Sequence, residues 1–264
     1  MLTLSEIFIY PVKSLGGISL QTAEVEECGL KYDRRYLLVD EHQMFMTQRD
    51  FPQMALLNLS FAENGFNVLN IKNNTSIIIP FRSDSKKTIK VKIWNDVCDA
   101  VVVDKDLDAW FSKALNKKCS LVYMPDNEKR VVEKKYIDEG HIVSFADAYP
   151  FLIIGQASLD DLNSKLISPL PMNRFRPSFV FSRGNPYEED NWKKFKIGVA
   201  EFEAVKPCAR CVITTTDQQT AVRNDEPLKT LSTYRKINNN VMFGMNVVCH
   251  KTGCISINEN ILHS

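Results

Sequence analysis

The segment from Lys206 to Asp217 places two cysteines and an arginine directly before a run of β-branched residues. Cys208 and Cys211 are separated by two residues, and Arg210 stands immediately before the second cysteine. A thiolate is a soft metal ligand and a nucleophile, and a neighbouring guanidinium favours its deprotonated form. Cysteine is also among the most buried residue types, so two of them near a strand can equally be small core residues. The spacing alone leaves a metal ligand, a nucleophile and a core position open.

Two further cysteines, Cys249 and Cys254, raise the alternative of a structural zinc site. Cys208-x-x-Cys211 has the spacing of one half of such a site, but Cys249 and Cys254 are farther apart than the usual second half. A redox Cys-x-x-Cys normally opens a helix, whereas the sequence Val-Ile-Thr-Thr-Thr at residues 212–216 predicts a strand. Both alternatives are therefore weaker than a metal ligand of another kind or a nucleophile.

Three basic residues and a serine have the chemistry to bind a phosphate. Lys13-Ser14 precedes two glycines and so joins a cation and a hydroxyl to a flexible turn. Arg34 and Arg176 each flank a predicted strand, and a guanidinium can bind phosphate through two hydrogen bonds. A full P-loop signature is missing from the sequence. A solvated lysine, or an arginine paired with a carboxylate such as Asp33, is the structural alternative for these residues.

The composition argues against several classes of function. The 264 residues carry 33 Lys+Arg and 32 Asp+Glu, which gives a net charge of +1, so the sequence does not predict a nucleic-acid surface. The first ten residues lack the basic start and long apolar core of a signal peptide, and no apolar run is long enough to cross a bilayer. Seven cysteines form an odd set, which argues against a disulfide scaffold. We expect a cytoplasmic protein with no nucleic-acid or membrane partner.

The elements that must position these residues are mostly strands. Apolar residues at helical spacing predict a helix over 106–116, and Ser158-x-x-Asp161 resembles the capping box of a second one. A short third helix is expected after Pro227. The β-branched and aromatic runs predict strands over 7–12, 36–40, 66–71, 76–80, 89–94, 97–103, 179–181, 197–205, 212–216 and 242–248.

These elements predict a β-rich α/β chain of the α+β class. The strands of the first hundred residues suggest a small barrel or sandwich, packed on further strands with a few helices. A boundary is expected within residues 118–140, which are polar and carry turn formers. The predicted units are residues 1–120 and 121–264.

Seven motifs follow one another along the chain in the order seen in MOSC proteins. They are Tyr10 to Ser14, Asp33-Arg34, Thr47-Gln48-Arg49, Phe145 to Pro150, Ala157-Ser158-Leu159-x-x-Leu162-Asn163, Arg174 to Pro177, and Cys208-x-Arg210-Cys211. On these residues the chain resembles the branch of bacterial YcbX and the mitochondrial amidoxime-reducing component. The resemblance implies an N-terminal β-barrel-like domain packed on, and intertwined with, a MOSC β-barrel domain.

The resemblance also implies a molybdenum cofactor, a pterin dithiolene that chelates molybdenum. Cys211 matches the cysteine that ligates the metal, Arg210 is implied to face the cofactor, and Cys208 is implied to be a structural or auxiliary partner. The residues implied to hold the terminal phosphate and the pterin are Lys13, Ser14, Arg34 and Arg176. A phosphate dianion and an anionic metal complex need cations, and dispersed Lys and Arg can supply them in a nearly neutral protein.

The implied activity is the reduction of N-hydroxylated compounds such as hydroxylamines, amidoximes and N-hydroxylated bases. Electrons would come from a separate donor protein, a ferredoxin, a flavodoxin or a cytochrome with its reductase. Protons would come from solvent, Asp147 or His141, and Thr47-Gln48-Arg49 would support the site. The alternative is a carrier without redox activity that binds the cofactor or transfers sulfur through a cysteine persulfide, because MOSC domains also occur in cofactor sulfurases.

Two positions depart from the family pattern. Ser178 follows the arginine-proline segment where the family commonly has Asn, and Ala221 stands where the family commonly has Gly. Neither residue is a predicted ligand. We expect them to affect substrate access and one turn, and to leave cofactor binding intact.

Overall fold

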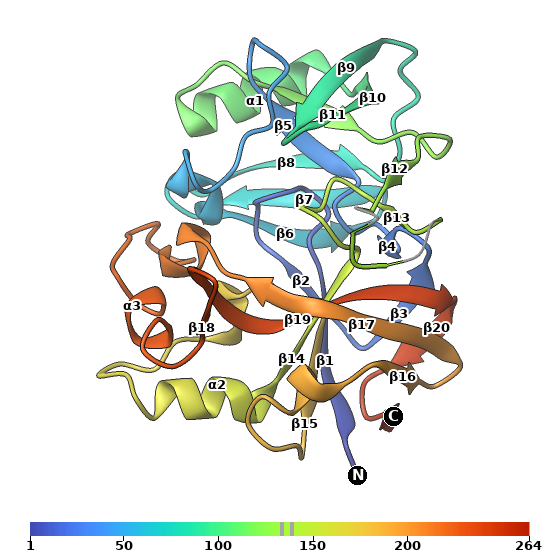
Figure 1. The fold of residues 1–264 in the computed structure, drawn as a ribbon. Coiled ribbons are helices and arrows are strands. Elements are labelled where there is room, and N and C mark those ends of the chain that lie inside the picture. Colours follow the sequence, from blue (N-terminus) through green and yellow to red (C-terminus); the bar gives the residue numbers. More distant parts are fainter. Residues whose placement is uncertain (133–134, 138–139, 264) are drawn as a thin grey trace.

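The computed structural model describes residues 1–132, 135–137 and 140–263, and strands dominate it. In Figure 1 the cyan and green strands gather at one end of the molecule with one helix, and the yellow to red strands gather at the other end. The blue strands at the N-terminus extend into the yellow and red end. The predicted β-rich α+β class is confirmed.

One large sheet joins both ends of the chain. Its strands lie in the order β2 (Ile18–Leu20), β1 (Thr3–Ile9), β15 (Phe179–Ser182), β14 (Phe151–Gly155), β19 (Asn240–Lys251), β17 (Ala200–Ala209), β16 (Lys194–Ile197) and β21 (Ile261–His263), with β18 (Lys236–Ile237) on β19. Strands β14 and β15 run parallel, whereas β1 pairs antiparallel with β15. Buried rings such as Phe151, Phe179 and Phe202 fill the core beneath this sheet.

The other region is built from residues of the first half of the chain. One sheet has the order β5 (Tyr36–Val39), β11 (Ser120–Tyr123), β10 (Asp96–Val102) and β9 (Thr88–Ile93), and another has the order β6 (Leu57–Ala62), β7 (Gly65–Asn70) and β8 (Thr75–Pro80). Helix α1 (Lys105–Leu115) packs Phe111 into the core that holds Phe66 and Leu121. The predicted hairpin of β7 and β8 is confirmed.

Strands from the start and the end of the chain share sheets. β3 (Thr22–Glu26) pairs with both β4 (Gly29–Leu30) and β20 (Gly253–Ser256). A short ladder joins β12 (Arg130–Val131) to β13 (Ile142–Val143). A cut near residue 120 would therefore separate paired strands, and the division into 1–120 and 121–264 stays a prediction.

The helices follow the predicted order with one correction. Asp104 caps α1 by accepting from the backbone N–H of Asp106 at 2.7 Å, and the helix ends at Asn116 in left-handed conformation. Helix α2 (Gln156–Asn163) starts earlier than predicted, and the expected capping box is wrong. Ser158 lies inside the helix. Its hydroxyl does not cap the helix but donates to the buried carboxylate of Glu189, 2.9 Å from Oε2. Helix α3 (Leu228–Leu231) follows Pro227 as expected.

Two predicted strands are wrong in their extent or type. Residues 197–205 do not form one strand, because Gly198 has a φ of 53° and turns the chain from β16 into β17. The strand predicted at 212–216 is instead the 3₁₀ helix η4 (Val212–Thr215), in which the hydroxyl of Thr214 donates to the Cys211 carbonyl at 2.9 Å. Local bonds of this kind override the strand preference of β-branched residues. The remaining 3₁₀ helices in the described ranges are η1 (Pro52–Leu56), η2 (Met172–Arg174) and η3 (Glu188–Asn191).

Candidate functional site

The residues predicted to bind the cofactor surround one cavity of about 270 Å³. Its walls come from loops and from strands β14, β17 and β19, and Arg49, Lys206 and Cys208 contribute to them as well. The predicted site residues in the lining are Lys13, Ser14, Arg34, Asp147, Arg176, Arg210 and Cys211. The fold thus brings together residues that are far apart in the sequence.

Lys13 and Ser14 lie in the loop after β1, where backbone contacts fix the chain. The Lys13 N–H donates to the Tyr36 carbonyl at 2.9 Å, and Ser14 has a left-handed φ of 67°. A left-handed non-glycine residue costs about 1–3 kcal/mol and is typical of functional sites. The buried Lys13 ammonium donates to the Phe145 carbonyl at 2.7 Å and to Asp147 Oδ1 at 2.5 Å. Burial lowers the pKa of Lys13 to about 8, although Asp147 favours its charged form.

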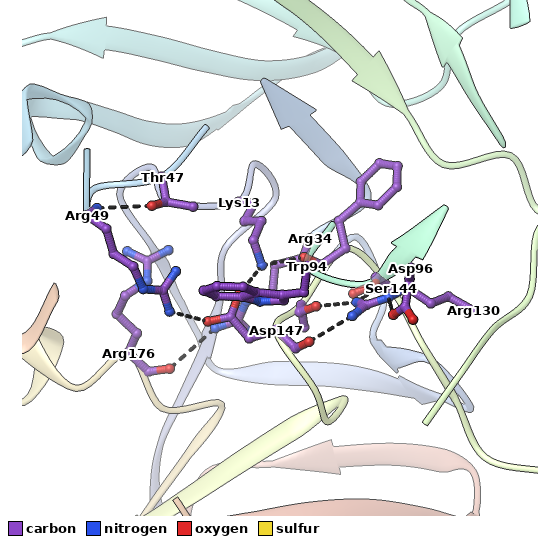
Figure 2. A network of polar contacts seen from close by, with 12 residues as sticks. Lys13, Arg34, Thr47, Arg49, Trp94, Asp96, Arg130, Ser144, Asp147 and Arg176 are labelled. Carbon is purple, nitrogen blue, oxygen red and sulfur yellow. Dashed lines mark hydrogen bonds and ion pairs between the residues drawn. The ribbon is translucent and has the colours of Figure 1, made fainter. Parts of the chain in front are cut away.

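Asp147 is the acceptor on which three donors converge (Figure 2). Besides Lys13, it accepts from Arg49 Nη2 at 2.8 Å and from Trp94 Nε1 at 3.4 Å. Burial would raise the pKa of Asp147, but the two cations outweigh burial and hold that pKa well below its usual range. The carboxylate is therefore ionised at neutral pH. In this state it positions Lys13 and Arg49 and has no proton to give.

Arg130 supports the Asp147 loop, although in the sequence it is only one residue of a polar segment with turn formers. Its guanidinium bonds to Asp96 Oδ2 at 2.6 Å, to the Ser144 carbonyl at 3.1 Å and to the Asp147 carbonyl at 2.8 Å (Figure 2). A third carbonyl, that of Ala146, is also within bonding distance. The signal for this role was not in the sequence, because the carbonyls that Arg130 binds become neighbours only when β12 pairs with β13.

Two predicted arginines pack against one tyrosine ring. The guanidinium carbons of Arg34 and Arg176 lie 4.5 Å and 4.1 Å from the ring centroid of Tyr10. Arg34 also forms an ion pair with Asp33 at 2.5 Å, and Asp33 accepts from the Tyr10 N–H at 2.7 Å. Arg34 is therefore paired with Asp33 and also lines the cavity. Both arginines have left-handed backbones, with φ of 49° and 56°.

Three arginines in the cavity wall, Arg49 among them through its Nη1, keep a buried donor that has no hydrogen-bond partner within the described residues. Arg176 uses Nη1 to donate to the Leu15 carbonyl at 2.7 Å, but its Nη2 is unpaired. Arg210 donates to the Phe175 carbonyl and to Cys208 Sγ, at 2.5 Å and 3.1 Å, while its Nε is unpaired. Burial lowers the pKa of Arg176 to about 10, so it stays charged at neutral pH. Buried unpaired cationic donors point to an anionic ligand.

Cys208 lies near the end of β17, which is irregular there, and Cys211 lies two residues beyond that end. The pairing of β17 with β19 shifts register between Ala204 and Lys206 and between Pro207 and Ala209, and such bulges redirect side chains near binding sites. Cys211 follows at the start of η4, and both thiols line the cavity. Arg49 lies close to Cys211. Burial disfavours charge on Arg49, but Asp147 and Cys211 outweigh it and raise the pKa of the guanidinium.

The other candidates for chemistry lie elsewhere. Cys249 is buried in the core, Cys254 is exposed, and the described residues contain no group of three or more His, Cys, Asp or Glu side chains that could hold a metal ion. The ring of His141 packs edge-on against that of His250, 4.9 Å between centroids. In the structure, the candidate chemistry of the late cysteines therefore concentrates on Cys208 and Cys211.

The donor set fits the predicted cofactor. An anionic group that enters the cavity meets Lys13, Arg34, Arg49, Arg176 and Arg210, with Asp147 as the carboxylate among the lining residues. A thiol that stands beside guanidinium groups can serve as a soft metal ligand. Lys13, Ser14, Arg34 and Arg176 carry donors that could hold a phosphate and a pterin, and the thiols of Cys208 and Cys211 could reach a metal in the same cavity.

Comparisons with known proteins agree with this description. Residues 1–118 match the MOSC N-terminal beta barrel domain, and residues 140–262 match the MOSC domain. Mitochondrial amidoxime-reducing component 1 of Danio rerio is 32% identical over 272 residues, which cover 97% of this chain and 83% of that protein. The same component of Mus musculus is 31% identical over 244 residues, which cover 88% of this chain and 71% of that protein.

A different kind of protein also matches. The molybdenum cofactor sulfurase of Oryza sativa subsp. japonica is 29% identical over 263 residues, which cover 92% of this chain but 32% of that protein. Across the part of the chain that the structure describes, no helix combines the length and apolar character that a membrane span needs. The two domain matches and the relatives above 30% identity place the chain in the MOSC family, in the branch of the amidoxime-reducing components.

Proposed function

We propose that the protein is a molybdenum-cofactor-dependent reductase of N-hydroxylated compounds, such as hydroxylamines, amidoximes or N-hydroxylated bases. One observation carries the proposal: a single cavity is lined by the cationic residues and by the thiols that such a cofactor needs. The similarity to amidoxime-reducing components supports the same reaction class. A cytoplasmic location stays a prediction.

The chain's own residues divide the work of binding. Lys13, Ser14, Arg34 and Arg176 hold the phosphate and pterin, Arg210 neutralises charge near the metal, and Cys211 ligates the metal. When bound, the cofactor supplies two-electron chemistry at molybdenum. Electrons come from a separate donor protein, a ferredoxin, a flavodoxin or a cytochrome with its reductase.

Asp147 was predicted to take part in catalysis, and its contacts suggest how. The ionised carboxylate orients Lys13 and Arg49, so its role in the proposal is that of a positioning group. Transfer of a proton from Asp147 to the substrate would require it to leave these ion pairs first. Solvent is the simpler source of the protons that the reduction of an N–OH group consumes.

The test is the reduction of benzamidoxime to benzamidine by metal-replete protein with a chemically reduced dye as electron donor. The N–O bond breaks, and two electrons and two protons give benzamidine and water; this product is the amine followed below. We expect benzamidine to accumulate with wild-type protein and with Cys254→Ala, whose thiol is exposed and lies outside the cavity lining. Cys211→Ala should form none. Metal-replete wild-type protein that forms no amine would argue against the reductase.

The similarity to a molybdenum cofactor sulfurase favours a second candidate, a carrier without redox activity. In that case Cys211 would act as a nucleophile that carries a persulfide. The carrier predicts cofactor or sulfur transfer to an acceptor without amine formation. Mass spectrometry of Cys211 after incubation with a persulfide donor, which passes its outer sulfur to the thiolate and leaves as a thiol, separates the two, because a thiol that ligates a metal is protected from persulfidation.

A further inference from the structure

Residues 216–223, called the strap here, follow η4 and contact Gln48. They thus link the end of the cavity that carries Cys211, the cysteine end, to the end that carries Ser14, the anchor end, where the proposed function places the phosphate. It folds back on itself through a bridge between Thr216 and Arg223, and Asp217 Oδ1 accepts from the N–H groups of Gln219 and Thr220 at 2.9 Å each. Asp217 Oδ2 also forms an ion pair with Arg174 at 2.8 Å. The strap is therefore a fixed turn.

Gln48 and Gln218 form a reciprocal pair of side-chain amides between the strap and the first half of the chain. Gln48 is completely buried, and its Nε2 donates to the Ser14 carbonyl at 2.8 Å and to Gln218 Oε1 at 3.1 Å. Gln218 Nε2 donates back to Gln48 Oε1 at 3.0 Å and to the Thr216 carbonyl at 3.0 Å. Because both outer partners are carbonyls, which only accept, each amide has one permitted orientation.

Arg223 binds the same loop from the other side. Its Nη2 donates to the Arg49 carbonyl at 2.8 Å and also contacts the Gln48 carbonyl. Its Nε donates to Thr216 Oγ1 at 3.1 Å. The strap thus holds the backbone of Arg49, whose guanidinium lies close to Cys211.

A continuous path of hydrogen bonds and peptide units therefore joins the anchor end to the cysteine end. It runs from the Ser14 carbonyl through Gln48 and Gln218 to Thr216, whose N–H donates to the Ile213 carbonyl at 3.0 Å within η4. The N–H of Thr214 donates in turn to the Cys211 carbonyl at 3.1 Å. A ligand that binds both ends gains affinity when their separation is fixed before it arrives.

We propose that Gln48 and Gln218 are positioning residues that set the separation between the anion anchor at Ser14 and the thiol of Cys211. The inference rests on the proposed function for its purpose, because it assumes one ligand that spans both ends. The amide pair contributes no donor to the cavity lining, so its effect is on geometry.

The first test uses metal-free protein, so it does not depend on the reductase proposal. Iodoacetamide labelling, resolved by peptide mass spectrometry, gives the alkylation rates of Cys211 and of the exposed Cys254 in one sample. We expect Gln218→Ala to raise the rate at Cys211 several-fold and to leave Cys254 unchanged. Gln219→Ala is the matched control, because Gln219 is an exposed residue of the same strap and its backbone N–H, which the substitution keeps, donates to Asp217 Oδ1.

The second test uses the loaded holoprotein and follows release of molybdenum after dilution into chelator. A ligand that is no longer held in place before the metal arrives binds it less tightly, so Gln218→Ala should release the metal several-fold faster than the wild type. Gln48→Ala combined with Gln218→Ala should add little, because the two amides act as one unit. Equal alkylation and release rates in Gln218→Ala and Gln219→Ala would overturn the inference.

The two proposals fail in distinguishable ways. Faster alkylation at Cys211 in Gln218→Ala together with no amine formation by wild-type protein would support the positioning role and reject the reductase. Amine formation by wild-type protein with unchanged alkylation and release in Gln218→Ala would support the reductase and reject the positioning role. A urea unfolding curve for each variant excludes a general loss of stability, which would also raise labelling at the buried Cys249.

Discussion

The two ends of the cavity are built in different ways. At the anchor end, which carries Ser14, the buried Lys13 and the half-buried Arg34 are already paired with Asp147 and Asp33, at 2.5 Å each. At the cysteine end, the thiol of Cys211 stands on a short 3₁₀ turn after a bulged strand and depends on the strap for its position. The anchor end can recognise an anion by charge without the other end, whereas the cysteine end becomes useful only when its distance from the anchor is right.

The largest expected effect separates the two ends directly. Lys13→Met removes a buried cation, and truncation of one member of a buried charge pair typically costs about 2–5 kcal/mol of binding free energy. We expect metal-free Lys13→Met to lose most of its affinity for inorganic pyrophosphate in calorimetric titration. Cys211→Ala should bind pyrophosphate like the wild type. Equal losses in both variants would mean that the ends are not separate.

A smaller effect is expected when the carboxylate between the cations is neutralised. Asp147→Asn leaves Lys13 and Arg49 without their counter-ion, and we expect a loss of about 1–3 kcal/mol in the free energy of unfolding, discounted because the Asp147 side chain is 46% exposed. The pKa of Asp147 is held well below its usual range in the folded protein. Its contribution is therefore complete at neutral pH and is lost progressively as the pH falls from the ordinary pKa of an aspartate, about 4, through that lowered pKa.

Urea unfolding at pH 7 measures this loss against a matched control. Asp126→Asn breaks the pair with Arg35 at 2.6 Å, but Asp126 is 61% exposed, so the loss should stay below about 0.5 kcal/mol. Losses of the same size in both variants would contradict the importance given to the Asp147 cluster.

The pH dependence of anion binding gives a sharper view of the anchor end. Burial lowers the pKa of Lys13 to about 8, so its ammonium loses its proton as the pH rises through that value. Affinity for pyrophosphate should fall above pH 8, by up to about tenfold per pH unit where one proton is linked to binding. Lys13→Arg should remove this fall, because a guanidinium stays protonated. A wild-type affinity that is flat between pH 7.5 and 9.5 would contradict the assignment.

The smallest effect concerns the strap. Ala221 has a left-handed φ of 59°, which explains why glycine suits this position. Ala221→Gly should therefore stabilise the protein, by up to about 1 kcal/mol. The same substitution at the exposed Ala109 inside α1 should destabilise it by about 1 kcal/mol. Thermal unfolding that shows the same sign for both would contradict this interpretation of the strap.

The sequence predicted the residue types of the site better than their contacts. Lys13, Arg34 and Cys211 could be proposed from the order of the motifs along the chain, because the residue types alone left a solvated lysine, an ion-paired arginine and a core cysteine open. Their contacts could not be proposed, because Asp147 meets Lys13 across 134 positions of sequence. The strand predicted at 212–216 failed for a local reason, since the threonine hydroxyls bond back to carbonyls three residues earlier. Arg130 and Gln218 carried no signal, because their roles exist only once distant loops meet.

The most direct measurement is the molybdenum and pterin content of the purified protein after expression in a host that makes the cofactor, beside Cys211→Ala and Cys208→Ala. We predict near-stoichiometric molybdenum and pterin in the wild type. Cys211→Ala should retain pterin and lose most of the molybdenum, and Cys208→Ala should retain both. Zinc or no metal in the wild-type protein, or full molybdenum in Cys211→Ala, would contradict the assignment of Cys211 as the metal ligand.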